Sequence, residues 1–473
     1  MEKRIVPTRI VDVPNRCENV IAAASNSFRN SCLSIRSPVL YKEFKNIILK
    51  LDKLFIIQRG HMDPITNPFA PGAGSQPPEL AGRENILTDA RTALGRVKIG
   101  RAARSQMLLG LRGVGKTVLL NRINEIAGEE SYLTVVLEAP ENRGLAEMLV
   151  PPLRSLLFQL SRVERSRKIA KRGLGILRSF ASLLKISVGD VEFGVQAETG
   201  TADSGNLESD LPEVLLAVAS AAKEAGSSVA LFVDEVQFLS KIDLGALIVS
   251  IHRIGQKGLP LVLFGAGLPQ LAALAGEAKS SAERLFIYPV VGALPDNAAS
   301  DAIRAPVIRE GVQITDEAVE IIVRKTQGYP YYLQEWGFHA WNAAIESPIT
   351  EEDARRATID ALRHLDTGFF RVRLDRLTPR ERDYMRAMAE LGPGPHRSGE
   401  IAQTLHMAVQ PAGPLRNGLI KKGMIFSPQH GDTSFTVPMF DEFMRRSIPN
   451  WVPNTPCAPE SARPEKPKKR SGK

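Results

Sequence analysis

The 473-residue chain has few cysteines, few aromatic residues and no long apolar run. Its three cysteines, Cys17, Cys32 and Cys457, lie near the ends, which excludes a disulfide framework, and neither they nor the histidines show the spacing of a zinc site. The longest weakly charged run, residues 259–276, contains two prolines and three glycines and is therefore not an apolar span. No secretory signal is visible at the amino terminus. We therefore expect a cytoplasmic protein without a membrane segment.

Charge is distributed unevenly along the chain. The formal net charge is +9, but residues 1–61 carry 11 Lys/Arg against 5 Asp/Glu, and residues 457–473 carry 6 against 2. The body between them is nearly neutral, so net charge says little about nucleic-acid binding by the folded part. From composition, we expect residues 1–79 to be an extension that is disordered or precedes the true start at Met62, and residues 451–473 to be a disordered basic tail.

Short apolar runs alternate with helical patterns from Leu80 onward. The predicted strands are residues 106–109, 132–137, 229–233, 261–264 and 286–288. Because these runs are continuously apolar, they indicate an α/β fold with a parallel sheet that helices cover on both faces. Residues 162–210 interrupt the alternation, and we interpret them as an insertion. This insertion is either a solvated basic helix with a loop or an arm that contacts nucleic acid or a partner.

The segment from Gly110 to Thr117, GLRGVGKT, fits the pattern G-x-x-x-x-G-K-[ST] and lies between a predicted strand and a predicted helix. Glycines allow consecutive backbone N–H groups to surround phosphate oxygens, and the following helix directs its positive end at the same anion. Lys116 reaches the outer phosphates, and the Thr117 hydroxyl is an oxygen ligand suited to Mg²⁺. The segment therefore predicts a nucleoside triphosphate site.

Two acids, Asp234 and Glu235, directly follow the apolar run 229–233. A buried strand that ends in acids presents them at the carboxyl edge of the sheet, where ligands bind. We expect Asp234 to hold Mg²⁺ through water and Glu235 to orient and deprotonate the attacking water. Together with the upstream glycine-rich loop, this pair predicts an NTPase with a separate catalytic glutamate.

These motifs resemble those of AAA+ ATPases of the origin-recognition-complex-like group, which borders on the STAND signalling NTPases. Residues 80–84 (LAGRE) resemble the box that packs by the adenine, and residues 234–239 (DEVQFL) resemble the second Walker motif. Arg284 precedes the last predicted strand, where such proteins place an arginine finger that acts on a neighbouring subunit. Pro330 lies in a Gly-Tyr-Pro element that resembles the lid proline of STAND proteins. The alternative for Arg284 is an ion pair with Glu283 or another surface acid.

The resemblance implies a P-loop RecA-like sheet with a helical lid, a C-terminal winged helix-turn-helix domain, and ATP and Mg²⁺ as ligands. The implied domains are an ATPase core at 80–295, a lid at 296–370 and a winged helix at 371–450. The expected nucleotide contacts are Gly110, Gly113, Val114, Gly115, Lys116, Thr117, Arg83 and Pro330. The expected catalytic residues are Glu235, Lys116 and Arg284, and the expected metal ligands are Thr117 and Asp234.

Two departures from the family pattern concern the groups that stabilise the transferring phosphoryl group. The fourth strand ends in residues 264–267 (FGAG) without a polar sensor, and the lid region 329–334 contains no sensor arginine. Because each such charge is worth orders of magnitude in rate, we expect slow ATP turnover that a partner or self-assembly raises.

The C-terminal residues predict three helices and a hairpin. Thr378 and Glu381 form a capping-box pattern around Pro379, which predicts a helix start. If this domain binds double-stranded DNA, Arg416, Lys421 and Lys422 lie near the groove or its phosphates. The alternative is a protein-contact module. The sequence thus predicts a nucleotide-controlled switch coupled to DNA or a protein partner, or a regulatory switch with structural nucleotide and no DNA binding.

Overall fold

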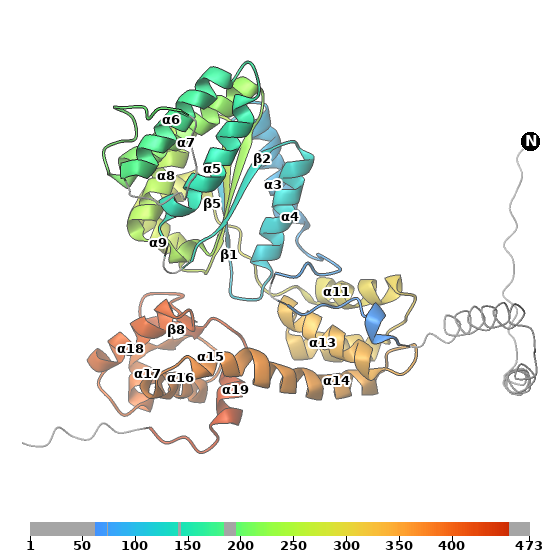
Figure 1. Ribbon diagram of the computed structural model, residues 1–473. Coiled ribbons are helices and arrows are strands. Elements are labelled where there is room, and N and C mark those ends of the chain that lie inside the picture. Colours follow the sequence, from blue (N-terminus) through green and yellow to red (C-terminus); the bar gives the residue numbers. More distant parts are fainter. Residues whose placement is uncertain (1–61, 73, 141–142, 184–194, 454–473) are drawn as a thin grey trace, which may run out of the picture. The chain divides into compact units, whose positions relative to one another are not determined.

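The computed structural model describes residues 62–72, 74–140, 143–183 and 195–453 (Figure 1). The predicted extension 1–61, part of the predicted insertion and the tail from residue 454 lie outside the described residues. The described residues other than Met62 and 345–347 belong to one compact unit, and all contacts given below lie within it. Within the described ranges, no helix is long and apolar enough to span a bilayer.

The central layer is a parallel sheet of five strands with the order β2-β3-β4-β1-β5. The strands are β1 (Ser105–Leu109), β2 (Leu133–Glu138), β3 (Val229–Asp234), β4 (Leu261–Gly267) and β5 (Phe286–Ile287). Every residue of β1, β3 and β4 is buried, as their continuous apolar runs predict. β2 differs because it is an edge strand that pairs only with β3, and its Val136 side chain is 51% exposed.

Helices cover both faces of this sheet, with α3 and α4 on one face and α5 to α8 on the other (Figure 1). The elements of this part are α3 (Glu84–Lys98), α4 (Lys116–Glu129), α5 (Leu145–Ser161), α6 (Arg167–Leu183), α7 (Leu207–Ala225), η2 (Val236–Phe238), α8 (Lys241–Gln256), α9 (Leu271–Ala278) and α10 (Ala282–Leu285). The predicted insertion contains α6, which packs against both α5 and α7. Its Leu174, Leu177 and Phe180 side chains are buried, whereas Lys168, Lys171 and Arg172 are exposed, so α6 is a layer of the core with a solvated basic face.

A second group of helices follows the sheet. It comprises α11 (Asp296–Arg309), α12 (Asp316–Thr326), α13 (Pro330–Ala343), α14 (Glu351–His364), a π-type stretch η3 (Leu365–Phe370) and α15 (Arg371–Asp375). Trp336 and Trp341 are buried in the core of this group.

Part of the extension 1–79, which we expected to be disordered or to precede the true start, is folded against α13. The short helix η1 (Pro64–Thr66) lies there, Phe69 is 2% exposed, and its ring occupies the space beside Gly337. Asn67 donates a hydrogen bond to the Phe338 carbonyl oxygen (3.0 Å). Burial of the Phe69 ring and the hydrogen bond of the Asn67 amide thus stabilise a segment whose composition is typical of disorder.

The C-terminal residues form helices around a small antiparallel sheet of order β6-β8-β7. The elements are α16 (Pro379–Leu391), β6 (His396–Arg397), α17 (Ser398–Thr404), α18 (Val409–Lys421), β7 (Ile425–Phe426), β8 (Asp432–Phe435) and α19 (Phe440–Ser447). The capping box of Thr378 and Glu381 is present, as predicted. The predicted hairpin is formed by β7 and β8, in which Ile425 pairs with Phe435 and Phe426 pairs with Ser434.

Candidate nucleotide-binding site

The glycine-rich loop connects β1 to α4, as the sequence predicts. Gly113 and Gly115 have φ angles of +84° and +90°, a region that favours glycine. A side chain at Gly110 would stand 2.2 Å from the Val291 carbonyl oxygen, so the chain passes there too closely for any other residue. The loop therefore has the tight curvature that aims backbone N–H groups at a common centre.

The three side chains expected to hold a metal–phosphate group meet at the end of the sheet. The Thr117 hydroxyl donates to Asp234 Oδ2 over 2.5 Å. Lys116 is only 6% exposed, and its Nζ donates to the Leu111 carbonyl oxygen (2.9 Å) without forming an ion pair with any described acid. Burial lowers the pKa of Lys116, although Glu235 and Asp234 oppose the shift. Burial likewise raises the pKa of Asp234, against the hydrogen bond from Thr117.

Glu235 adopts a left-handed backbone conformation with φ +53° directly after β3. Its carboxylate accepts a hydrogen bond from the Gln237 side-chain amide. The Gln237 Oε1 atom in turn accepts the Leu268 N–H (3.0 Å), just beyond the end of β4. A side chain at Gly267 would stand 2.7 Å from Gln237 Oε1, so the glycine leaves room for this amide. Gln237 thus places a polar side-chain amide at the end of β4, where residues 264–267 have no polar side chain of their own.

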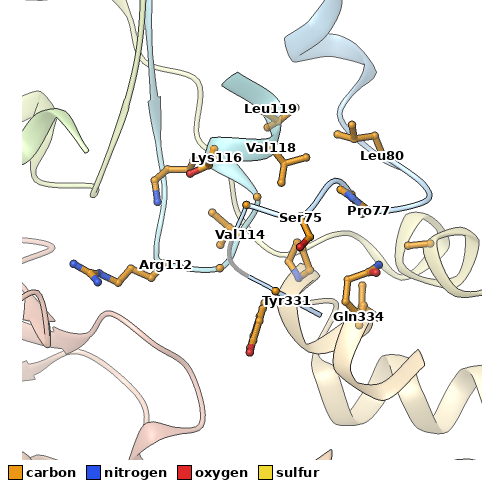
Figure 2. Close-up of a pocket in the computed structure, with 18 of the residues that line it drawn as sticks. Ser75, Pro77, Leu80, Arg112, Val114, Lys116, Val118, Leu119, Tyr331 and Gln334 are labelled. Carbon is orange, nitrogen blue, oxygen red and sulfur yellow. The ribbon is translucent and has the colours of Figure 1, made fainter. Parts of the chain in front are cut away.

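A cavity of about 400 Å³ lies beside the glycine-rich loop. It is lined by residues of the segment before α3, the loop, α4, α13 and η3–α15. In Figure 2, Arg112 and Lys116 extend to one side of it, whereas Pro77, Leu80 and Val118 lie on the other. Glu235 also lines the cavity. The pocket therefore has a cationic side and an apolar side.

Arg83 and Pro330, both expected to contact nucleotide, line the same cavity. The Arg83 guanidinium is buried, which lowers its pKa, and it donates to the carbonyl oxygens of Val114 (3.4 Å) and Gly292. Arg83 therefore also supports the backbone of the glycine-rich loop. Pro330 begins α13, and the next N–H, that of Tyr331, donates to the Gly113 carbonyl oxygen (3.1 Å).

Arg373 is a cavity residue that the sequence did not indicate. It lies on α15, its guanidinium stands 3.8 Å from the centre of the Phe369 ring, and Nη1 donates to the Phe369 carbonyl oxygen (2.7 Å). Burial and the nearby Arg112 lower the pKa of Arg373. Among the described residues it has no acidic partner, so the cavity contains an arginine whose charge is uncompensated. The only sequence signal was its position after the aromatic pair Phe369-Phe370.

Arg284 lies outside this cavity. Its side chain is exposed on the short helix α10 and forms no ion pair with Glu283 or any other residue that the structure describes. The structure therefore does not show the ion pair that was the alternative role for Arg284.

Comparisons with known proteins agree with this fold. Residues 79–287 match the family model described as AAA ATPase domain, and residues 367–444 match a model described as a domain of unknown function. A Walker-type ATPase of Pyrococcus abyssi is similar in fold, with 18% identity, a TM-score of 0.50 and coverage of 77% of this chain and 96% of that chain.

Two further solved structures match with lower TM-scores. The RuvB Holliday junction branch migration motor of Thermotoga maritima has 16% identity, a TM-score of 0.40 and coverage of 80% and 100% of the two chains. The ORC1 protein of Aeropyrum pernix in complex with DNA has 15% identity, a TM-score of 0.41 and coverage of 80% and 94%. No curated protein matches the sequence. The family match and the parallel sheet together support a nucleotide-binding P-loop ATPase domain of the AAA type in residues 79–287.

Proposed function

We propose that the chain binds ATP, hydrolyses it slowly with Mg²⁺, and uses the nucleotide to control the position of its C-terminal domain. The observation that carries this proposal is the contact of the Thr117 hydroxyl with the buried Asp234 carboxylate beside the buried Lys116 ammonium. A hydroxyl, a carboxylate and a lysine at a glycine-rich loop are the donor set for a magnesium-bound triphosphate.

Each residue then has a defined task. Lys116 and the loop N–H groups would bind the outer phosphates, and Thr117 and, through water, Asp234 would hold Mg²⁺, which would supply positive charge against the phosphates. Glu235 accepts a proton from the attacking water, and the Gln237 amide holds its carboxylate at the strand end. The apolar side formed by Pro77, Leu80 and Val118, with Pro330, receives the adenine. The sequence contains no Asn-Lys-x-Asp motif for guanine.

Arg373 takes the place of the sensor arginine that the lid sequence lacks. Its guanidinium lines the cavity without an acidic partner among the described residues, so a bound triphosphate supplies the missing negative charge. Arg373 lies on α15, at the start of the proposed winged-helix domain 371–450. A contact between Arg373 and the triphosphate therefore also links nucleotide binding to this domain.

We divide the chain into an ATPase core at 80–295, a lid at 296–370 and a winged-helix domain at 371–450. The order of helix, short strand, two helices and hairpin in α16 to β8 supports the winged-helix assignment. The lid and this domain are joined by a hydrogen bond from the Tyr332 hydroxyl to the Pro438 carbonyl oxygen (2.6 Å). Nucleotide-dependent movement of α13 therefore moves the C-terminal domain.

The contacts of the cations predicted to lie near a groove favour a protein partner over DNA as the output. Arg416 donates to Thr433 Oγ1 and to the Asp432 carbonyl oxygen (both 2.9 Å), and Lys422 pairs with Glu381 (2.7 Å). These two cations are engaged within the domain, which leaves Lys421 exposed. Of the three cations predicted to lie near a groove, only Lys421 is therefore free to contact phosphates, which favours a protein partner over DNA.

The proposed function is tested by ATP turnover of the full chain with and without double-stranded DNA, together with native mass measurement of the nucleotide-bound assembly. We expect turnover well below roughly ten per second, the median for enzymes, and no stimulation by DNA. If Arg284 acts on a neighbouring subunit, turnover rises with chain concentration and Arg284→Ala removes that rise. Fast turnover by a monomer would contradict the slow-switch proposal, and strong stimulation by DNA would restore the DNA-binding alternative.

Gln237→Ala is expected to lower kcat about 10- to 100-fold and to leave KM unchanged, because one hydrogen bond to a charged group contributes about 1.5–3 kcal/mol. Steady-state kinetics over a range of ATP concentrations measure this effect. Gln270→Ala is the matched control, since Gln270 lies just beyond the end of β4, which the Gln237 side chain also reaches, but its Oε1 atom has no hydrogen-bond partner in the described part of the chain. Equal kcat in the two variants would show that Gln237 does not position Glu235.

A further inference from the structure

Two histidines and a glutamate converge where α13 and α14 pack together, away from the expected magnesium ligands. Glu335 and His339 lie one turn apart on α13, and His364 is the last residue of α14. Glu335 Oε2 stands 3.1 Å from His364 Nδ1 and 3.7 Å from His339 Nε2. One ligand atom from each residue fits within a 4.8 Å span.

The buried charge of Glu335 makes this cluster unusual. Its side chain is 1% exposed, and no lysine or arginine among the described residues pairs with it. A carboxylate removed from water without a cation destabilises the fold strongly. The Tyr331 hydroxyl donates to the other oxygen, Oε1 (3.1 Å), which orients the carboxylate but does not neutralise it.

His339 has coordinating capacity that nothing in its surroundings uses. Its Nε2 atom is buried, faces the Glu335 carboxylate and has no hydrogen-bond partner in the described part of the structure. Asp360, the other acid near this ring, is engaged with Arg363 (2.7 Å).

We propose that Glu335, His339 and His364 form a binding site for a divalent transition metal, with Zn²⁺ as the best-fitting ion. Two ligand atoms that are each about 2.0–2.1 Å from a tetrahedral zinc stand about 3.3 Å apart, close to the two measured separations. Two imidazoles and a carboxylate suit Zn²⁺ better than Mg²⁺. His364 is 60% exposed, so an ion reaches the site from solvent. No zinc spacing is visible in the sequence because one ligand comes from a second helix, 25 residues beyond His339.

The test is calorimetric titration of the full chain with Zn²⁺ in excess Mg²⁺, which occupies the oxygen-ligand site at Asp234 but competes poorly for imidazole. We expect His339→Ala and Glu335→Gln to weaken this binding about 100-fold or more, beyond the 10- to 100-fold typical of losing an outer-shell partner. Glu335→Gln preserves side-chain shape, so it distinguishes lost coordination from lost folding. Co²⁺ substituted for Zn²⁺ should give visible absorption in the wild type that both variants lack.

His252→Ala is the matched control, because His252 lies on α8 outside the cluster. The titrations are read as differences between variants, which removes any contribution from the cysteines. Equal Zn²⁺ affinity in the wild type, His339→Ala and Glu335→Gln, or no Zn²⁺ binding by the wild type, would overturn the proposal.

Discussion

Glu235→Gln is expected to lower ATP turnover about 10²- to 10⁴-fold, the range that a general base contributes, and to leave ATP affinity near that of the wild type. The reason is local chemistry. A glutamine has the size of glutamate but accepts no proton from water. The residues proposed to bind the nucleotide, Lys116, Thr117 and Asp234, keep their contacts in this variant. Turnover measured at saturating ATP, beside equilibrium binding of ATP, separates the two effects.

Glu283→Gln is the control for this variant, because Glu283 is an exposed glutamate outside the cavity. Its turnover and affinity should equal those of the wild type. Turnover that survives Glu235→Gln would remove Glu235 from the chemistry and would assign the proton transfer to another group.

Lys116→Ala is expected to weaken ATP binding about 10- to 100-fold, because it removes a charge-assisted contact of about 1.5–3 kcal/mol to the outer phosphates. The variant should remain folded. Lys116 is 6% exposed and forms no ion pair with a described acid, so burying its charge costs free energy. An alanine at this position carries no charge and avoids that cost. Calorimetric binding and thermal unfolding of the same sample test both expectations.

Lys98→Ala is the matched lysine control, since Lys98 lies on the surface and pairs with Glu130 (2.8 Å) far from the loop. Unchanged ATP affinity in Lys116→Ala would contradict the proposed nucleotide site.

The Glu235→Gln and Lys116→Ala variants together also distinguish the two candidate functions. A switch with structural nucleotide keeps its output in Glu235→Gln and loses it in Lys116→Ala, whereas an output driven by hydrolysis is lost in both.

The sequence predicted the backbone of the site better than its side chains. The neighbouring positions of Lys116, Thr117 and Asp234 followed from a general rule, because parallel strands that lie close in a sheet end at the same edge. The edge position of β2 did not follow, because strand order is a property of the whole sheet. Its apolar run resembles that of a central strand, although only one side of it is paired.

Residues whose roles depend on tertiary contacts were missed. Gln237 reaches the end of β4 only because Gly267 leaves space, and nothing in a linear pattern shows that contact. Arg373 enters the cavity after the π-type stretch η3, at a boundary that we had placed between two domains. Phe69 is ordered by packing beside Gly337, which composition cannot reveal.

The most direct test of the central claim is calorimetric titration of the full wild-type chain with ATP, first with Mg²⁺ and then with EDTA. If the loop and the two acids at the end of β3 hold one magnesium nucleotide, the chain binds one ATP per molecule and the affinity falls when Mg²⁺ is removed. Absence of ATP uptake in the presence of Mg²⁺ would contradict this account of the site.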